Sequence, residues 1–177
     1  MPLTANDQQM STHQWPGIPS PDFPGHREVV YSEGQLSGYR WYDAHNATPA
    51  FPFGFGLTYG VFAYSNLSVA DRAVTFTATG SGGCDTPQLY VSFPDAGSDR
   101  GSGPATPSKV LRYFQKTCQP QAVITYTLTD RDLSTWDVQR KEWVLARGTF
   151  GIHVAGSAQE MAGAVRGPVA LRGTMLV

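Results

Sequence analysis

Short segments in which apolar and polar residues alternate follow one another from Phe62 to the end of the chain, and they constrain the fold most strongly. Period-two alternation is typical of strands that are buried on one face. The expected strands are Phe62–Leu67, Val74–Ala78, Leu89–Phe93, Lys109–Phe114, Val123–Leu128, Glu142–Leu145, Thr149–Val154 and Ala170–Leu176. Turn-rich breaks separate them at Gly80–Gly83, Asp95–Pro107 and Asp130–Asp132. Short strands at this spacing predict an all-β protein built as a β-sandwich.

The first 60 residues have a different character and predict an irregular arm that is rich in proline and aromatic residues. Seven of the thirteen prolines lie within the first 52 residues, and each proline ends a helix and removes a donor from a strand ladder. One helical turn is expected around Gln35 to Tyr42. Nine large aromatic residues lie in the forty or so residues from position 15 to position 55: Trp15, Phe23, Tyr31, Tyr39, Trp41, Tyr42, Phe51, Phe53 and Phe55. The sequence therefore predicts an arm over residues 1–60 and a sandwich over residues 61–177.

Charge and hydropathy exclude two classes of partner. Thirteen basic and fourteen acidic residues nearly cancel, so no broad basic field exists to attract nucleic acid or an anionic membrane surface. No apolar run approaches the roughly 18 to 20 residues that a membrane-spanning helix needs. The N-terminus is polar and proline-rich, so no signal peptide is expected in this chain.

Two runs rich in glycine and aromatic residues identify a family. Gly38–Asp43 reads GYRWYD, and Pro52–Tyr59 reads PFGFGLTY. The pair resembles the junction near the C-terminus of glycoside hydrolase family 3 enzymes, the β-glucosidases and their relatives. Other segments match that family in the same order: Tyr31–Gly34, Gln88–Ser92, Leu111–Lys116, Leu128–Ser134 and Gly148–Val154. The resemblance implies an immunoglobulin- or fibronectin type III-like sandwich over residues 61–177, preceded by the family's linker.

The same resemblance bears on function. In this family the nucleophilic aspartate and the acid/base glutamate lie on domains that precede the region matched here, and neither catalytic motif occurs in the 177 residues. The resemblance therefore implies a non-catalytic structural or accessory module. Two alternatives stay open: a β-glucosidase-type glycosidase, alone or with a partner chain, and a carbohydrate-binding module. Family members are often secreted or periplasmic, but no signal peptide is recognised in this sequence, so the localisation of the chain is unknown.

Two carboxylates are candidates for residual catalysis. A retaining glycosidase needs an acid and a nucleophile about 5 to 5.5 Å apart, and Glu33 and Asp43 stand in neighbouring motifs. Neither position matches the family's catalytic pair. The favoured role is a salt bridge or turn contact with Arg40.

The aromatic arm supplies the candidates for contact with a carbohydrate or with another domain. They are Tyr39, Arg40, Trp41, Tyr42, Phe53 and Phe55. Three interpretations stay open: a wrap packed on the sandwich, a surface that docks on family 3 catalytic domains or on a second copy of the chain, and a sugar-stacking platform. A mobile tail is not expected, because large rings gain stability from burial.

Metal and cofactor sites are not expected. Four histidines are dispersed without the spacing of a zinc motif: His13, His26, His45 and His153. Three aspartates flank a turn, where carboxylates cap backbone N–H groups: Asp130, Asp132 and Asp137.

Cys84 and Cys118 are the only cysteines, so they permit one disulfide or two buried thiols. The frequent export of family members favours the disulfide. Asn46 and Asn66 begin N-glycosylation tripeptides that would be used only in a eukaryotic source.

Overall fold

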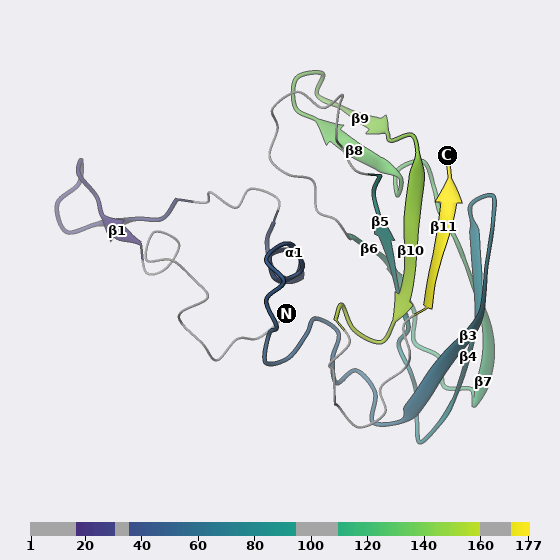
Figure 1. Cartoon of the computed structure of the whole chain (residues 1–177). Helices are drawn as coiled ribbons and strands as arrows, with labels where there is room; N and C mark the ends of the chain where they lie inside the picture. Colours follow the sequence, from purple (N-terminus) through teal and green to yellow (C-terminus); the bar gives the residue numbers. More distant parts are fainter. Residues whose placement is uncertain (1–16, 31–35, 95–109, 160–170) are drawn as a thin grey trace.

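Two antiparallel sheets form the body of the protein in a computed structural model, which describes residues 17–30, 36–94, 110–159 and 171–177. One sheet has the order β3-β4-β7, with strands Val61–Ala70, Ala73–Ser81 and Gln121–Thr127. The other has the order β11-β10-β5-β6, with strands Leu171–Leu176, Thr149–Ala155, Gln88–Ser92 and Val110–Phe114. Figure 1 shows the two sheets facing each other. The predicted all-β sandwich is confirmed.

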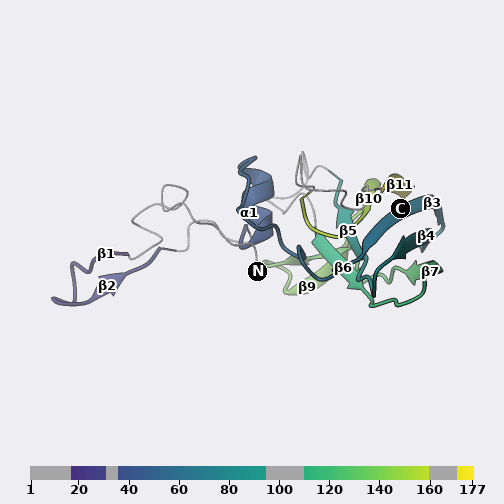
Figure 2. The same ribbon diagram turned by 90° about the horizontal axis from the view of Figure 1, so that it is seen from below.

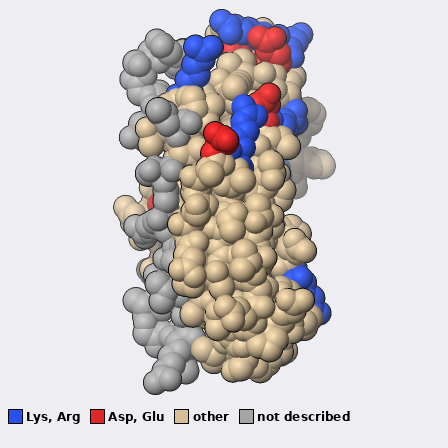
Figure 3. Space-filling model, turned by 90° about the vertical axis from the view of Figure 1, so that its right-hand side faces the viewer, with Lys and Arg blue, Asp and Glu red and all other residues tan. Residues whose placement is uncertain are grey.

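The core lies between the sheets and follows the alternation in the sequence. In β4 the apolar residues Val74 and Phe76 are fully buried, while the outward hydroxyl of Thr75 bonds to that of Thr125 on β7 at 2.9 Å. The opposite sheet contributes Leu89, Val91, Phe150, Ile152 and Val154. Figure 3 shows the side of the molecule on which β4 and β7 lie, and the middle of this side carries few charged side chains. The period-two pattern therefore sorts apolar from polar side chains as expected.

All eight expected strands overlap observed ones, with small differences at their ends. Strand β4 continues to Ser81, so the turn after it is narrower than the expected Gly80–Gly83 break. The single expected helical turn is α1 (Tyr39–Ala44), which follows Gly38 at a φ of 60°. The long break from Asp95 to Pro107 lies outside the described residues. Helix α1 is six residues long, and no helix in the described part of the chain could span a membrane.

One hairpin was not expected from the sequence. Strands β8 (Ser134–Asp137) and β9 (Glu142–Leu145) form a separate two-stranded sheet. Trp136 and Trp143 are directly opposed across it, with ring centroids 5.5 Å apart. The pattern missed β8 because its polar residues do not alternate with apolar ones, and a cross-strand aromatic pair stabilises the hairpin instead.

A second small hairpin lies in the arm. Strands β1 (Ile18–Pro19) and β2 (Arg27–Glu28) are two residues each. The side chain of Arg27 donates a hydrogen bond to the carbonyl oxygen of Gly17 at 2.5 Å. Figure 2 shows this hairpin well apart from the sandwich, with α1 between them.

A disulfide joins Cys84 to Cys118 and ties the segment before β5 to the connection between β6 and β7. The neighbouring residues Asp85 and Thr117 exchange two backbone hydrogen bonds of 2.7 and 2.8 Å. The disulfide therefore closes a loop between two cysteines that are 34 positions apart in the sequence.

Removing this bond tests its contribution to stability. The double variant Cys84→Ala/Cys118→Ala is expected to lower the free energy of unfolding by about 3 to 4 kcal/mol, because the open chain regains loop entropy when it unfolds. Urea denaturation of the oxidised protein and of the double variant measures the difference. A loss below about 1 kcal/mol would show that the β-bridge alone holds this loop.

A buried carboxyl group lies beside the disulfide. Asp85 is 1% exposed, and its Oδ2 accepts a hydrogen bond from the hydroxyl of Tyr64 at 2.7 Å. Burial raises the pKa of Asp85, although the bonds from Tyr64 and from the backbone of Thr86 oppose that rise. The folded protein therefore favours the protonated carboxyl relative to the unfolded chain.

This shift predicts a pH dependence with a definite sign. The contribution of Asp85 to stability is fully present below its unfolded pKa of about 3.9 and is lost as the pH rises through the higher folded pKa. Asp85→Asn keeps an acceptor for Tyr64 without a charge. As the pH rises from 4 to 7, the free energy of unfolding of the variant should therefore increase relative to that of the parent protein. Parallel denaturation series check this, and a constant difference across the range would contradict it.

Candidate functional site

Strand β5 is buried on both of its faces, and the arm covers the outer one. Leu89 and Val91 point into the core, while Gln88 and Tyr90 point outward and are nevertheless 1% exposed. The ring of Tyr39 in α1 packs edge-on against Tyr90 at 5.7 Å and lies 5.2 Å from the ring of Phe53. These rings cover the outer face of the sheet at this strand.

Hydrogen bonds hold the arm to parts of the sandwich that are far apart in sequence. The backbone N–H of Leu111 on β6 donates to the hydroxyl oxygen of Tyr39 at 2.8 Å. The N–H of Ala158, beyond β10, donates to the carbonyl oxygen of Phe53 at 2.8 Å. The side-chain amide of Gln159 donates to Asp43 at 3.1 Å and to the carbonyl oxygen of Ala47 at 3.2 Å. These contacts support the wrap interpretation for Tyr39 and Phe53.

Gly54 allows the arm to approach β5 closely. It has a φ of +85°, and a Cβ atom at this position would lie 1.9 Å from Nε2 of Gln88. That amide donates to the carbonyl oxygen of Gly156 at 2.8 Å, while its oxygen accepts a hydrogen bond from the hydroxyl of Tyr90. A side chain at position 54 would therefore displace the amide of Gln88, which makes hydrogen bonds through both its nitrogen and its oxygen.

The other arm candidates differ in exposure. Tyr42 is buried at 8% exposure, and Trp41 is half-buried with its ring stacked on His45 at 4.2 Å. The guanidinium of Arg40 lies 5.9 Å from the ring centre of Tyr39. Phe55 is 47% exposed. The structure thus brings most of these residues together but leaves Phe55 facing solvent.

The proximity of Glu33 and Asp43 stays a prediction. Glu33 lies outside the described residues. Oδ1 of Asp43 accepts a hydrogen bond from the side-chain amide of Gln159. This bond is a structural contact between the arm and the sandwich. The expected contact of either residue with Arg40 stays a prediction. Of the three aspartates expected at turns, Asp132 accepts from the backbone of Thr129 at 2.8 Å, and Asp137 caps two N–H groups at 2.9 Å.

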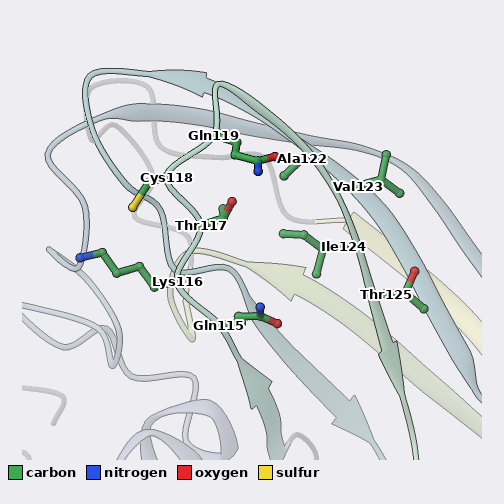
Figure 4. Close-up of a pocket in the computed structure, with 9 residues that line it drawn as sticks. All are labelled: Gln115, Lys116, Thr117, Cys118, Gln119, Ala122, Val123, Ile124 and Thr125. Carbon is green, nitrogen blue, oxygen red and sulfur yellow. The ribbon is translucent and has the colours of Figure 1, made fainter.

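A hollow of about 580 Å³ lies between β7 and the segment that precedes it. Figure 4 shows its lining, which is Gln115, Lys116, Thr117, Cys118, Gln119, Ala122, Val123, Ile124 and Thr125. This lining holds no carboxylate and no histidine, so it offers no acid/base pair for hydrolysis. The described residues also contain no group of three or more His, Cys, Asp or Glu side chains that could hold a metal ion.

An exposed apolar row runs from the arm into the start of β3. It comprises Phe51 at 51% exposure, Phe55 at 47%, Leu57 at 57%, Tyr59 at 103% and Val61 at 54%. The rings of Phe51 and Phe55 lie 5.8 Å apart. We call these five residues the arm face. Exposed large apolar side chains that lie against each other, as the rings of Phe51 and Phe55 do, are typical of an interaction site.

Sequence reasoning named Phe51 and Phe55 among the aromatic residues of the arm but missed Leu57, Tyr59 and Val61. A usable signal was present, because residues 51–61 hold a large apolar side chain at every second position, namely Phe51, Phe53, Phe55, Leu57, Tyr59 and Val61, with glycine at three of the positions between them. In an extended segment this spacing would place the side chains on one face.

Comparison with known proteins gives the chain a context. Residues 85–158 match the family model of the fibronectin type III-like domain. The chain is 31% identical to a probable β-glucosidase D from Aspergillus flavus over 161 residues, covering 74% of this chain and 20% of that protein. It is 35% identical to a probable β-glucosidase L from Aspergillus fumigatus over 176 residues, covering 83% of this chain and 22% of that protein.

A solved structure agrees with these matches. The β-glucosidase of glycoside hydrolase family 3 from Bifidobacterium adolescentis superposes with a TM-score of 0.72 at 27% identity, covering 98% of this chain and 25% of that one. The chain therefore spans about a fifth of the curated relatives and a quarter of this structural neighbour.

Gly54 and Gly56 provide a matched test of how the arm binds. Both have positive φ, but a Cβ at Gly56 meets nothing within 4 Å. Each alanine variant should lose about 1 to 2 kcal/mol of stability through backbone strain. Gly54→Ala should lose about 1 to 3 kcal/mol more, because its methyl group overpacks against Gln88. Urea denaturation compares the two, and equal losses would refute the close approach of Gly54 to β5.

Proposed function

Because the chain contains a fibronectin type III-like domain and resembles the C-terminal region of family 3 β-glucosidases, we propose that it is a non-catalytic module that docks on catalytic domains of that family. Its role is structural: it packs against those domains and stabilises their fold. The observation that carries this proposal is the arm face, which stays exposed although the rings of Tyr39 and Phe53 in the same arm are packed at β5.

Energetics favour a partner for this surface. Fully burying one large apolar side chain contributes about 1.5 to 3 kcal/mol. Four of the five side chains of the arm face are already about half buried, so burying all five gains roughly 5 to 9 kcal/mol, which exceeds only the lower estimates of the cost of association, near 4 kcal/mol. The arm beneath them is held by hydrogen bonds to Leu111, Ala158 and Gln159, so little further ordering is needed on docking.

The chemistry available in the described residues supports a non-catalytic role. Asp43 bonds to an amide of the fold, and the hollow beside β7 holds no carboxylate. Hydrolysis of a glycoside needs an acid and a second carboxylate at a fixed separation. The glycosidase alternative is addressed by an aryl β-glucoside assay of the purified chain across pH 4 to 8. Turnover that disappears in Asp43→Asn would overturn the proposal.

Docking on a catalytic domain can be tested by grafting. In the Bifidobacterium adolescentis β-glucosidase, the quarter that matches this chain is deleted or replaced by this chain. Deletion is expected to lower the melting temperature and the activity, and the graft to restore both in part. In the graft, Phe55→Ser/Tyr59→Ser should remove the restoration, because two docking side chains of the arm face become polar.

Val138→Ser is the matched control, because Val138 is 70% exposed but lies in the β8–β9 turn rather than on the arm face. It should leave the graft unchanged. Equal effects of the control and of the arm-face variant would contradict docking through this surface. Light scattering of the chain alone addresses the remaining interpretation: a dimer that Phe55→Ser/Tyr59→Ser abolishes would assign the arm face to a second copy instead.

A further inference from the structure

Strand β7 forms an open edge of its sheet. The order of that sheet is β3-β4-β7, so β4 covers one side of β7, and no strand in the described part of the chain pairs with the other side. The opposite edge of the same sheet, β3, lies beside β11 of the facing sheet. The segment that precedes β7 is separated from it by the hollow of about 580 Å³. The side of the sandwich at β7 is therefore open.

The register of β7 on β4 determines which backbone groups point toward this edge. Residues 121–127 of β7 pair with residues 73–79 of β4 without a shift. Directly after β7, the backbone N–H of Leu128 donates to the carbonyl oxygen of Arg72 at 2.9 Å. In an antiparallel ladder, residues that bond to the neighbouring strand alternate with residues whose backbone groups point away from it. The even-numbered residues of β7 therefore bond to β4, and the odd-numbered residues direct their N–H and C=O groups to the open edge.

Three of these odd-numbered residues are free to pair. The outward backbone groups of Gln121, Val123 and Thr125 have no hydrogen-bond partner among the described residues. The next outward residue ends the free stretch, because the carbonyl oxygen of Thr127 accepts the hydroxyl of Tyr113 at 2.7 Å. The side chains of the three free residues are exposed, that of Val123 at 71%. In Figure 4 the side chain of Val123 leaves β7 on the side opposite to that of Ile124.

The sequence of β7 lacks the features that usually protect an edge strand. Proteins discourage pairing at edges with charged residues, prolines and bulges. Gln121–Thr127 reads QAVITYT, without a charge, a proline or a glycine. The edge strand β3 has a register shift between Ser65 and Ser68, and the edge strand β6 carries Arg112. Of these edges, that of β7 is the one whose sequence favours the addition of another strand.

We propose that β7 pairs antiparallel with β7 of a second copy of the chain, which joins the two three-stranded sheets into one continuous sheet. The strand is self-complementary: a two-fold axis at Val123 places Val123 opposite Val123 of the second copy and Gln121 opposite Thr125. All of these residues direct their backbone groups outward, so each pair exchanges both of its hydrogen bonds. Because the paired residues are uncharged, no like charges meet across the axis.

The surroundings of β7 also suit a second copy. The middle of the side on which β7 lies carries few charged side chains (Figure 3), so no cluster of one charge opposes the approach of an identical surface. An uncharged strand also has no electrostatic preference for a charged peptide. The inference uses no residue of the arm face and is independent of the proposed function.

Hydrogen exchange tests the pairing on the intact chain. The amides of Gln121, Val123 and Thr125 should become protected by about tenfold or more as the protein concentration rises from about 20 μM to about 1 mM, because mass action fills the dimer. The amides of Ala122 and Ile124 bond to β4 and should be protected at every concentration. They are the internal control.

A charge at the axis should weaken the dimer. Val123→Lys places two ammonium groups opposite each other, so light scattering should show a dissociation constant raised by about tenfold. Val138→Lys is the matched control, because Val138 is 70% exposed but lies in the β8–β9 turn. Gln121→Pro removes an outward N–H at the first residue of the strand, where proline is tolerated, and should also weaken the dimer. It keeps the inference testable if Val123→Lys fails to fold.

Three results would overturn the inference: a chain that stays monomeric at about 1 mM, a dimer that Val123→Lys and Val138→Lys weaken equally, or a dimer without new protection at the three outward amides. The variant Phe55→Ser/Tyr59→Ser should leave this dimer intact. A dimer lost in that variant but kept in Val123→Lys would place the interface at the arm face instead. The graft reports on the arm face alone, so its failure with the β7 dimer intact would remove only the proposed function.

Discussion

The double-sided burial of β5 is the constraint on which the rest of this structure depends. A strand inside one sheet of a sandwich needs only its inner face covered, and Leu89 and Val91 meet that need. Gln88 and Tyr90 on the outer face are as deeply buried, so the arm is part of the folded unit rather than an appendage. Because the arm is held against this strand by rings and hydrogen bonds, its position is fixed, and the residues at its surface acquire a defined geometry.

A fixed arm explains why its surface residues divide into two kinds. Tyr39 and Phe53 face β5 and are used by the fold. Phe51, Phe55 and Tyr59 are exposed, and the fold does not use them. A surface of this kind on a chain that matches about a fifth of its longer relatives is consistent with a contact that another part of such a protein would complete.

The sandwich could be predicted from the sequence because its strands carry period-two alternation. Strand β8 could not, since Trp136 alone among its residues is large and apolar and its partner Trp143 lies on the next strand. The arm showed its aromatic content but not which rings are buried, because that depends on the register of Gly54 over Gln88, a contact between residues 34 positions apart. The hydrogen bond between Tyr39 and Leu111 had no signal in the sequence, because the two residues are 72 positions apart.

The attachment points of the arm also determine when it can form during folding. Its partners are Gln88 and Tyr90 on β5, Leu111 on β6, and Ala158 beyond β10. No one of these segments is a binding surface alone, and β5 lies between β6 and β10 only after both have paired with it. The arm precedes the sandwich in the sequence, but because long-range strand pairing is slow, it must reach its final place after those strands have paired. Until then its aromatic residues are exposed, which makes this the stage at which the chain is most prone to aggregate.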